Sequence, residues 1–172
     1  VANRPPLPLF TYPDAFGALA YLSAHPGIAP NRIGVLGFSW GAVVTMATAT
    51  EGIATQFGGP LRFKAHAANY PLCYAYNNPN IPGSQFGENA GNPLTGAPIL
   101  IQIGTEDGYD QGAEPCFALR ASLVAAEQDK LEVVAYDGAF HAWDRLQVPL
   151  TAVDPFSHLG AGGTVQTTVV FI

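Results

Sequence analysis

The chain has 172 residues, of which 48% are hydrophobic and 12% charged, and this predicts one globular domain spanning residues 1–172. Its net charge of −6, with seven basic residues and no basic stripe, excludes a nucleic-acid backbone as a partner. No apolar run approaches the roughly 20 residues that a membrane-spanning helix needs, so we expect a soluble protein with no membrane partner, of unknown compartment.

The first part of the chain predicts one helix and one strand. After a proline-rich lead-in at 1–10, the sequence Thr11-Tyr12-Pro13-Asp14 is typical of a helix start, with a capping Thr and a Pro in the first turn. Apolar residues at helical spacing then predict an amphipathic helix to about Ala24. Prolines and a glycine at 26–31 end this helix, and the apolar run at 32–37 predicts a buried strand.

The motif Gly37-Phe38-Ser39-Trp40-Gly41 follows this strand directly. Small residues at 42–50 predict a helix after it, ended by Gly52. Strand, Gly-x-Ser-x-Gly and helix in this order form the nucleophile elbow of an α/β-hydrolase, whose sharp turn presents Ser39 at its tip. We expect both glycines to be required, because a Cβ at either position would collide with nearby backbone. The alternative is a glycine-bounded turn with an incidental serine.

Three further strands are predicted downstream. They lie at 63–70, at 98–104 and at 131–136, and the second has the apolar character of a parallel strand covered on both faces. A helix is expected from 114 to about 128. Its predicted inner face consists of Phe117, Ala121 and Val124. This alternation of strands and helices predicts a mostly parallel α/β sheet flanked by helices.

Two segments lack a clear period. Residues 76–97 are rich in Asn, Pro and Gly and predict a long loop of the kind that serves a site. Residues 148–163 read as irregular, whereas 164–172 is a β-prone run.

A serine nucleophile needs a base within hydrogen-bond reach and an acid that orients the base. Asp107 follows the strand at 98–104, and His141 follows the strand at 131–136. Both should therefore lie with Ser39 at the carboxyl edge of the sheet, where ligands of α/β sheets bind. The chain order Ser, Asp, His is also that of the α/β-hydrolase fold. The pattern predicts a catalytic triad of Ser39, Asp107 and His141.

Other residues compete for these roles. Glu106 and Asp110 are alternatives for the acid, and Asp107 is favoured by its offset from the strand. The remaining histidines are expected either in solvent or in the core: His25 and His158 in solvent, His66 in the core. No paired His/Cys spacing typical of a metal site is present, and we expect neither a metal nor a cofactor.

Three motifs together resemble the dienelactone hydrolase family of α/β-hydrolases: Gly-Phe-Ser-Trp-Gly-Ala at 37–42, Gly-Thr-Glu-Asp at 104–107 and Phe-His-Ala-Trp-Asp-Arg at 140–145. The resemblance covers roughly residues 11 to 150. It implies hydrolysis of a small-molecule ester or lactone through an acyl-enzyme, with Ser39 attacking, His141 transferring the proton and Asp107 orienting it. It also implies that the backbone N–H of Trp40 contributes to the oxyanion hole.

The chain departs from the family pattern in several ways. The name-giving enzymes of the family have Cys where this chain has Ser39, which favours a general esterase over a dienelactone-specific enzyme. Arg145 matches a family arginine that binds a substrate carboxylate, the alternative being a surface ion pair with Asp144. The early strands of the fold, the loop with the second oxyanion donor and the closing helix have no counterpart in the sequence.

The domain is therefore predicted to be a partial α/β-hydrolase fold, truncated on its N-terminal side, with the Ser39 strand at an edge. A truncation on its C-terminal side stays open as well. A partner chain or a homo-oligomer would then complete the sheet. Two alternative functions stay open: a non-catalytic remnant that serves as an interaction or structural module, and a thioesterase or peptidase with the same triad.

Cys73 and Cys116 fall in neighbouring predicted loops of this sheet. Their placement favours a disulfide over two free thiols, which would suggest an oxidising compartment.

Overall fold

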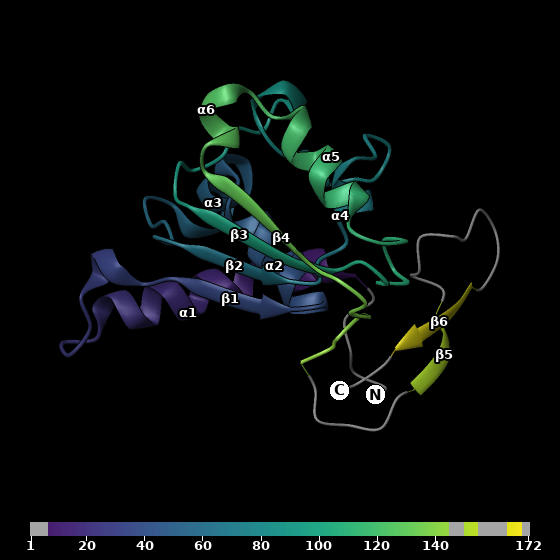
Figure 1. The fold of residues 1–172 in the computed structure, drawn as a ribbon. Coiled ribbons are helices and arrows are strands. Elements are labelled where there is room, and N and C mark those ends of the chain that lie inside the picture. The colour runs from purple at the N-terminus through teal and green to yellow at the C-terminus, as the bar shows by residue number, and fades with distance from the viewer. Residues whose placement is uncertain (1–6, 145–149, 155–164, 170–172) are drawn as a thin grey trace.

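The computed structural model describes residues 7–144, 150–154 and 165–169, with a four-stranded parallel sheet at its centre (Figure 1). The strands lie in chain order across the sheet: β1 (Val35–Phe38), β2 (His66–Asn69), β3 (Ile99–Gly104) and β4 (Leu131–Tyr136). Because all four run parallel, their carboxyl ends meet at one edge of the sheet. The predicted parallel α/β fold is confirmed, and β1 is an edge strand of this sheet.

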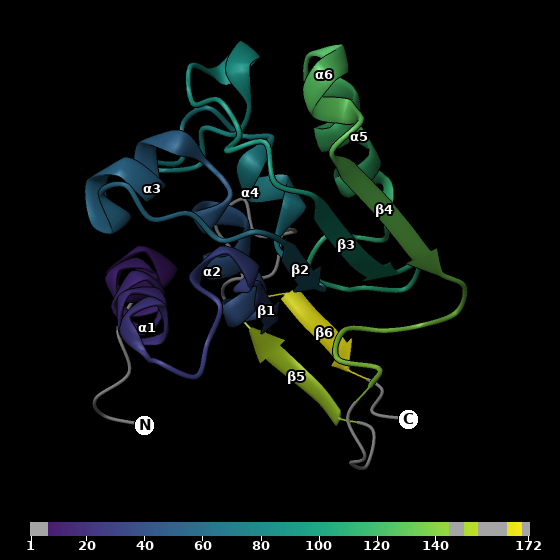
Figure 2. The same cartoon turned by 90° about the vertical axis from the view of Figure 1, so that its left-hand side faces the viewer.

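Helices and 3₁₀ turns connect the strands (Figure 2). In chain order they are η1 (Pro8–Thr11), α1 (Tyr12–Ala24), η2 (Pro30–Arg32), α2 (Trp40–Thr48), α3 (Glu51–Gly58), α4 (Cys73–Tyr76), η3 (Glu88–Ala90), α5 (Glu114–Ser122) and α6 (Ala125–Gln128). Helices α1 and α3 lie next to each other, whereas α5 and α6 lie beside β4. The helices thus lie along one face of the sheet, from β1 across to β4.

One face of the sheet carries the main core. Residues alternate between the two faces of a strand, so Ile99, Ile101 and Ile103 share a face, and α2 and α5 pack there through Met46 and Leu119. On the opposite face large apolar side chains keep substantial exposure: Leu36, Phe38 and Tyr136. A second cluster, built around Phe16 and Phe63, joins α1 to α3.

The helix predicted for 114–128 is interrupted. Helix α5 ends at Ser122, because Leu123 adopts an extended backbone (φ −75°, ψ 157°) that places its side chain in the core, and α6 starts two residues later. The predicted inner face was wrong. Phe117 is 45% exposed and Ala121 is also exposed, whereas Cys116 and Leu119 are buried. The buried face of α5 differs from the predicted one because it is set by packing against the sheet, which the local sequence pattern did not encode.

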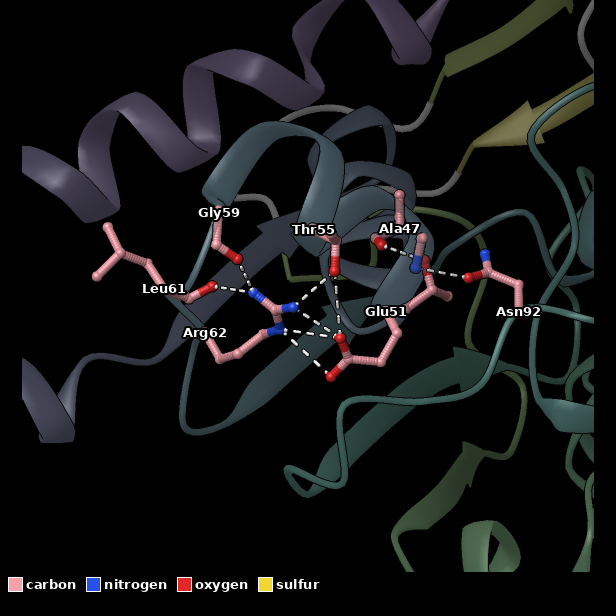
Figure 3. A network of polar contacts seen from close by, with 9 residues as sticks. Ala47, Glu51, Thr55, Gly59, Leu61, Arg62 and Asn92 are labelled. Atoms are coloured by element: carbon pink, nitrogen blue, oxygen red, sulfur yellow. Dashed lines mark hydrogen bonds and ion pairs between the residues drawn. The ribbon is translucent and has the colours of Figure 1, made fainter.

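Helix α3 was not predicted from the sequence. Helix α2 ends at Thr48, and Gly52, which we expected to end it, lies in the first turn of α3. Polar contacts fix both ends of α3 (Figure 3). The N–H of Gly52 donates to Asn92 Oδ1 at 2.8 Å, and Arg62 reaches from beyond the other end to Glu51 Oε2 at 2.7 Å and to the carbonyl of Gly59 at 2.6 Å.

Near the C-terminus β5 (Leu150–Asp154) and β6 (Val165–Val169) pair in antiparallel fashion. Strand β6 confirms the β-prone run predicted at 164–172, whereas β5 lies in a segment expected to be irregular. Among the helices of the described ranges, none combines the length and the apolar character needed to cross a membrane.

Candidate active site

Ser39 occupies the tight turn between β1 and α2. Its backbone φ is positive (φ 52°, ψ −113°), which is rare for a residue other than glycine. A Cβ added at Gly37 would overlap the carbonyl oxygen of Gly41, so the requirement for glycine at position 37 is confirmed. The same expectation for Gly41 was wrong, because a Cβ there meets no atom within 4 Å. The backbone of Gly41, rather than its Cα substituent, is what approaches the strand.

The structure brings the predicted residues Ser39, Asp107 and His141 together. The Nε2 atom of His141 lies 2.9 Å from Ser39 Oγ, and its Nδ1 atom lies 2.8 Å from Asp107 Oδ2. With the proton on Nδ1, His141 donates to the carboxylate and its Nε2 accepts from the serine hydroxyl. Asp107 and His141 are only 1% and 4% exposed, whereas Ser39 is half-buried. The serine is thus the member that a ligand reaches from solvent.

The loop after β3 fixes the orientation of Asp107. Its second carboxylate oxygen, Oδ1, accepts a hydrogen bond from the N–H of Tyr109 at 2.9 Å, and its carbonyl accepts one from the N–H of Gly112 at 3.0 Å. Both carboxylate oxygens therefore have a partner. The side chain of Asp107 is thus held in one orientation by the loop that carries it.

Aromatic rings enclose the imidazole of His141. The ring of Tyr109 lies 4.3 Å from it and the ring of Tyr70 lies 4.7 Å from it, measured between centroids. The hydroxyl of Tyr70 donates to Asp144 Oδ1 at 2.6 Å. Sequence reasoning did not identify either tyrosine. The available signal was position, because Tyr70 follows β2 directly, as the loop of Asp107 and Tyr109 follows β3.

The competing residues lie elsewhere. Glu106 is exposed. Asp110 is fully buried but accepts from the N–H groups of Cys73 and Tyr74, at 2.8 and 3.1 Å, rather than from His141. Burial raises the pKa of Asp110 to about 8, and the N–H donors of Tyr74 and Cys73 oppose this rise.

The other predicted site residues and histidines are placed as follows. His25 is exposed and His66 is in the core, as expected, and burial lowers the pKa of His66 to about 4. Trp40 is the first residue of α2, and its indole donates to Thr11 Oγ1 at 3.1 Å. Arg145 and His158 lie outside the described residues.

Cys73 and Cys116 form a disulfide between the starts of α4 and α5, as the sequence favoured. Together with Asp110 they make the one group of at least three His, Cys, Asp or Glu ligand atoms found close together in the described residues. Because a disulfide sulfur is not a thiolate, this group lacks the ligands that a soft metal ion requires.

A groove of about 830 Å³ opens at the amino ends of the strands, at the other end of the sheet from Ser39. Gly34, Ala65 and Pro98, at the amino ends of β1 to β3, are among its lining residues, and none of the triad residues lines it. Ligands of parallel α/β sheets bind at the carboxyl ends of strands, and this groove lies at the other end of the strands from Ser39.

The parallel sheet and the strand–Ser39–helix elbow define a partial α/β-hydrolase fold. Known proteins agree with this class. The chain belongs to the dienelactone hydrolase family, whose model matches residues 11–153. A comparison with curated protein sequences found no match.

Solved esterase and hydrolase structures share the fold. They include apo esterase 2 of Thermogutta terrifontis, with 18% identity and a TM-score of 0.57 over 83% of this chain and 59% of the esterase. The inhibited esterase B of Lactobacillus rhamnosis has 14% identity and a TM-score of 0.55 over 77% and 53% of the two chains. MGS-M1, an α/β-hydrolase from a Medee basin deep-sea metagenome library, has 22% identity and a TM-score of 0.53 over 76% and 49%. This chain thus spans about half to three fifths of their lengths.

Proposed function

We propose that the chain is a serine hydrolase that cleaves small-molecule carboxylic esters or lactones through an acyl-enzyme. The observation that carries the proposal is the unbroken series of hydrogen bonds from Asp107 through His141 to Ser39, with the serine on a nucleophile elbow. Membership of the dienelactone hydrolase family supports the same reaction class.

In this mechanism His141 Nε2 accepts the hydroxyl proton as Ser39 Oγ attacks the ester carbonyl. The buried carboxylate of Asp107 holds Nδ1–H in place and stabilises the imidazolium that forms. The imidazolium then gives its proton to the leaving alcohol, which leaves an acyl group on Ser39. A water molecule, deprotonated by the same Nε2, attacks the acyl carbonyl and releases the carboxylic acid.

The developing oxyanion needs N–H donors close to Ser39. We propose the backbone N–H of Trp40, in the first turn of α2, as one of them. A second donor would come from a partner chain or a homo-oligomer that completes the sheet beyond the edge strand β1. Losing one such donor lowers kcat about a hundredfold or more, so completion of the sheet should matter for turnover.

Turnover of a panel of short-chain aryl esters and lactones tests the reaction class. We expect hydrolysis by the wild-type chain and none above background by Ser39→Ala. Ser122→Ala is a matched control, because Ser122 lies at the end of α5 and its hydroxyl donates to the carbonyl of Leu119. A folded wild-type chain that hydrolyses no member of the panel would instead support a non-catalytic interaction module. Thioesters and peptides are assayed beside the panel, and their preferential cleavage would indicate a thioesterase or a peptidase.

A further inference from the structure

Two loops that follow neighbouring strands hold His141 from different sides. The loop after β2 carries Tyr70, whose ring packs edge-on against the imidazole. The loop after β3 carries Asp107, which accepts from Nδ1, and Tyr109, whose ring lies 4.3 Å from the imidazole. The orientation of His141 therefore depends on the relative position of these two loops.

The same two loops are joined by two buried links. The carboxyl of Asp110 accepts hydrogen bonds from the N–H of Cys73, at 2.8 Å, and from the N–H of Tyr74, at 3.1 Å. The disulfide links Cys73 onward to Cys116 at the start of α5. Asp110, Cys73 and Cys116 are all fully buried. Cys73, where the disulfide begins, is three residues after Tyr70, and Asp110 is three residues after Asp107.

We propose that Asp110 and the Cys73–Cys116 disulfide form a clamp that positions His141, by fixing the Tyr70 loop against the Asp107 loop. None of the three clamp residues lies within hydrogen-bond reach of Ser39 or His141 in the described contacts, so the clamp acts through Tyr70 and Asp107. This inference deepens the proposed function and rests on it for its kinetic readout.

The chemistry of the clamp fits a positioning role. A carboxyl group buried without solvent is unfavourable unless its oxygens are hydrogen-bonded, and both oxygens of Asp110 accept from backbone N–H groups. Oδ2 also lies 3.7 Å from Cys116 Sγ. A disulfide sulfur has no proton to donate, so a hydrogen bond at this contact requires the proton to lie on Asp110. The raised pKa of Asp110 agrees with that protonated form.

The test compares kinetics and a spectroscopic signal in clamp variants. We would prepare Asp110→Ala, Asp110→Asn and the double variant Cys73→Ala/Cys116→Ala, with Glu106→Gln as the matched control. Glu106 belongs to the same loop but is exposed. The readouts are kcat and KM for an aryl ester and the downfield ¹H NMR signal of the His141 Nδ1 proton, which reports its hydrogen bond to Asp107.

We expect kcat to fall roughly tenfold to a hundredfold in Asp110→Ala and in the double variant, because loss of the clamp displaces a catalytic group. KM should stay nearly unchanged, because the clamp itself contacts no substrate. Asp110→Asn retains one acceptor oxygen and should recover part of the loss. The Nδ1 proton signal should shift or broaden in the same order, and Glu106→Gln should match the wild type.

Reducing the folded wild-type chain covers the case in which a variant does not fold. A water-soluble phosphine breaks the S–S bond, gives up two electrons and takes its oxygen from water, whose two protons complete the two thiols. A parallel fall in kcat and change in the Nδ1 signal supports the clamp. The proposal is overturned if folded clamp variants and the reduced chain keep wild-type kcat and an unchanged Nδ1 signal. The NMR readout does not depend on turnover, so it tests the clamp even if the esterase proposal fails.

Discussion

The Nε2 atom of His141 lies 2.9 Å from Ser39 Oγ, although the two residues are 102 positions apart in the chain. Ser39 stands in the turn between β1 and α2, and His141 follows β4 at the other edge of the sheet. Because the strands run parallel, both residues nevertheless lie at the carboxyl ends of the strands. The β3 loop between them supplies Asp107, 2.8 Å from the other ring nitrogen.

The role of Asp107 as the acid of the proposed triad can be tested by paired amide substitutions. Asp107→Asn should lower kcat/KM by about 10⁴, because the amide no longer holds the Nδ1–H tautomer or stabilises the imidazolium. Asp110→Asn should lower it far less, because Asp110 contacts the backbone of Cys73 and Tyr74 rather than His141. The measurement is ester hydrolysis by each purified variant. A greater loss in Asp110→Asn than in Asp107→Asn would contradict the assignment.

Two glycines of the elbow should respond differently to an added methyl group. Gly37→Ala should lower the free energy of unfolding by about 1–3 kcal/mol or more, because its Cβ would overlap the Gly41 carbonyl and the backbone must shift. Gly41→Ala places its Cβ in open space in the first turn of α2, and its stability should equal or slightly exceed that of the wild type. Urea unfolding measures both. Equal destabilisation of the two variants would be inconsistent with this geometry.

Much of this arrangement could be predicted from the sequence, because its signals are local. The apolar runs that form β3 and β4, and the glycine-bounded Ser39, depend on neighbouring residues alone. Asp107 and His141 were then found by their position after a strand, and His66 by its position within one. The parallel topology turns these positions into proximity.

The parts that could not be predicted depend on tertiary packing. Leu123 breaks the predicted helix because the core accommodates its side chain, and Phe117 faces solvent because α5 packs through Cys116 and Leu119 instead. The contacts of Tyr70 and Tyr109 with His141 join residues from three separate loops, and no periodicity records them. The first turn of helix α3 contains Gly52, whose N–H donates to Asn92 Oδ1, and Asn92 lies far along the chain.

The stability of the fold should depend on pH through Asp110. Burial raises its pKa from 3.8 to about 8, so between these values the folded chain keeps a proton that the unfolded chain has released. The free energy of unfolding therefore falls as pH rises through this window, by up to about 1.4 kcal/mol per pH unit. His66 has the opposite effect between pH 4 and 6.5, because burial lowers its pKa to about 4 and the unfolded chain binds the extra proton there.

Between about pH 4 and 6.5 the opposite effects of Asp110 and His66 on the free energy of unfolding cancel. From pH 6.5 to 8 only the effect of Asp110 remains of these two. Urea unfolding at several pH values in this window should give a falling free energy for the wild type and a flatter profile for Asp110→Asn. Identical slopes for the two proteins would exclude Asp110 as the titrating group.

Loss of the disulfide should destabilise the fold. Cys73 and Cys116 are separated by 43 positions, and a cross-link of this span removes enough chain entropy from the unfolded state to stabilise the fold by about 4 kcal/mol. The double variant Cys73→Ala/Cys116→Ala should lose about this much in urea unfolding, as should the wild type in the presence of a reductant. An unchanged unfolding midpoint under reduction would mean that the two sulfurs are not linked in the folded protein.

The central claim, that Ser39 is a nucleophile activated by His141, is tested most directly by the mass of the chain after exposure to a fluorophosphonate. We predict one covalent adduct, mapped by peptide mass spectrometry to Ser39, that is absent from Ser39→Ala and slowed strongly in His141→Ala. A folded wild-type chain that gains no adduct, or gains it at a serine other than Ser39, would contradict the account.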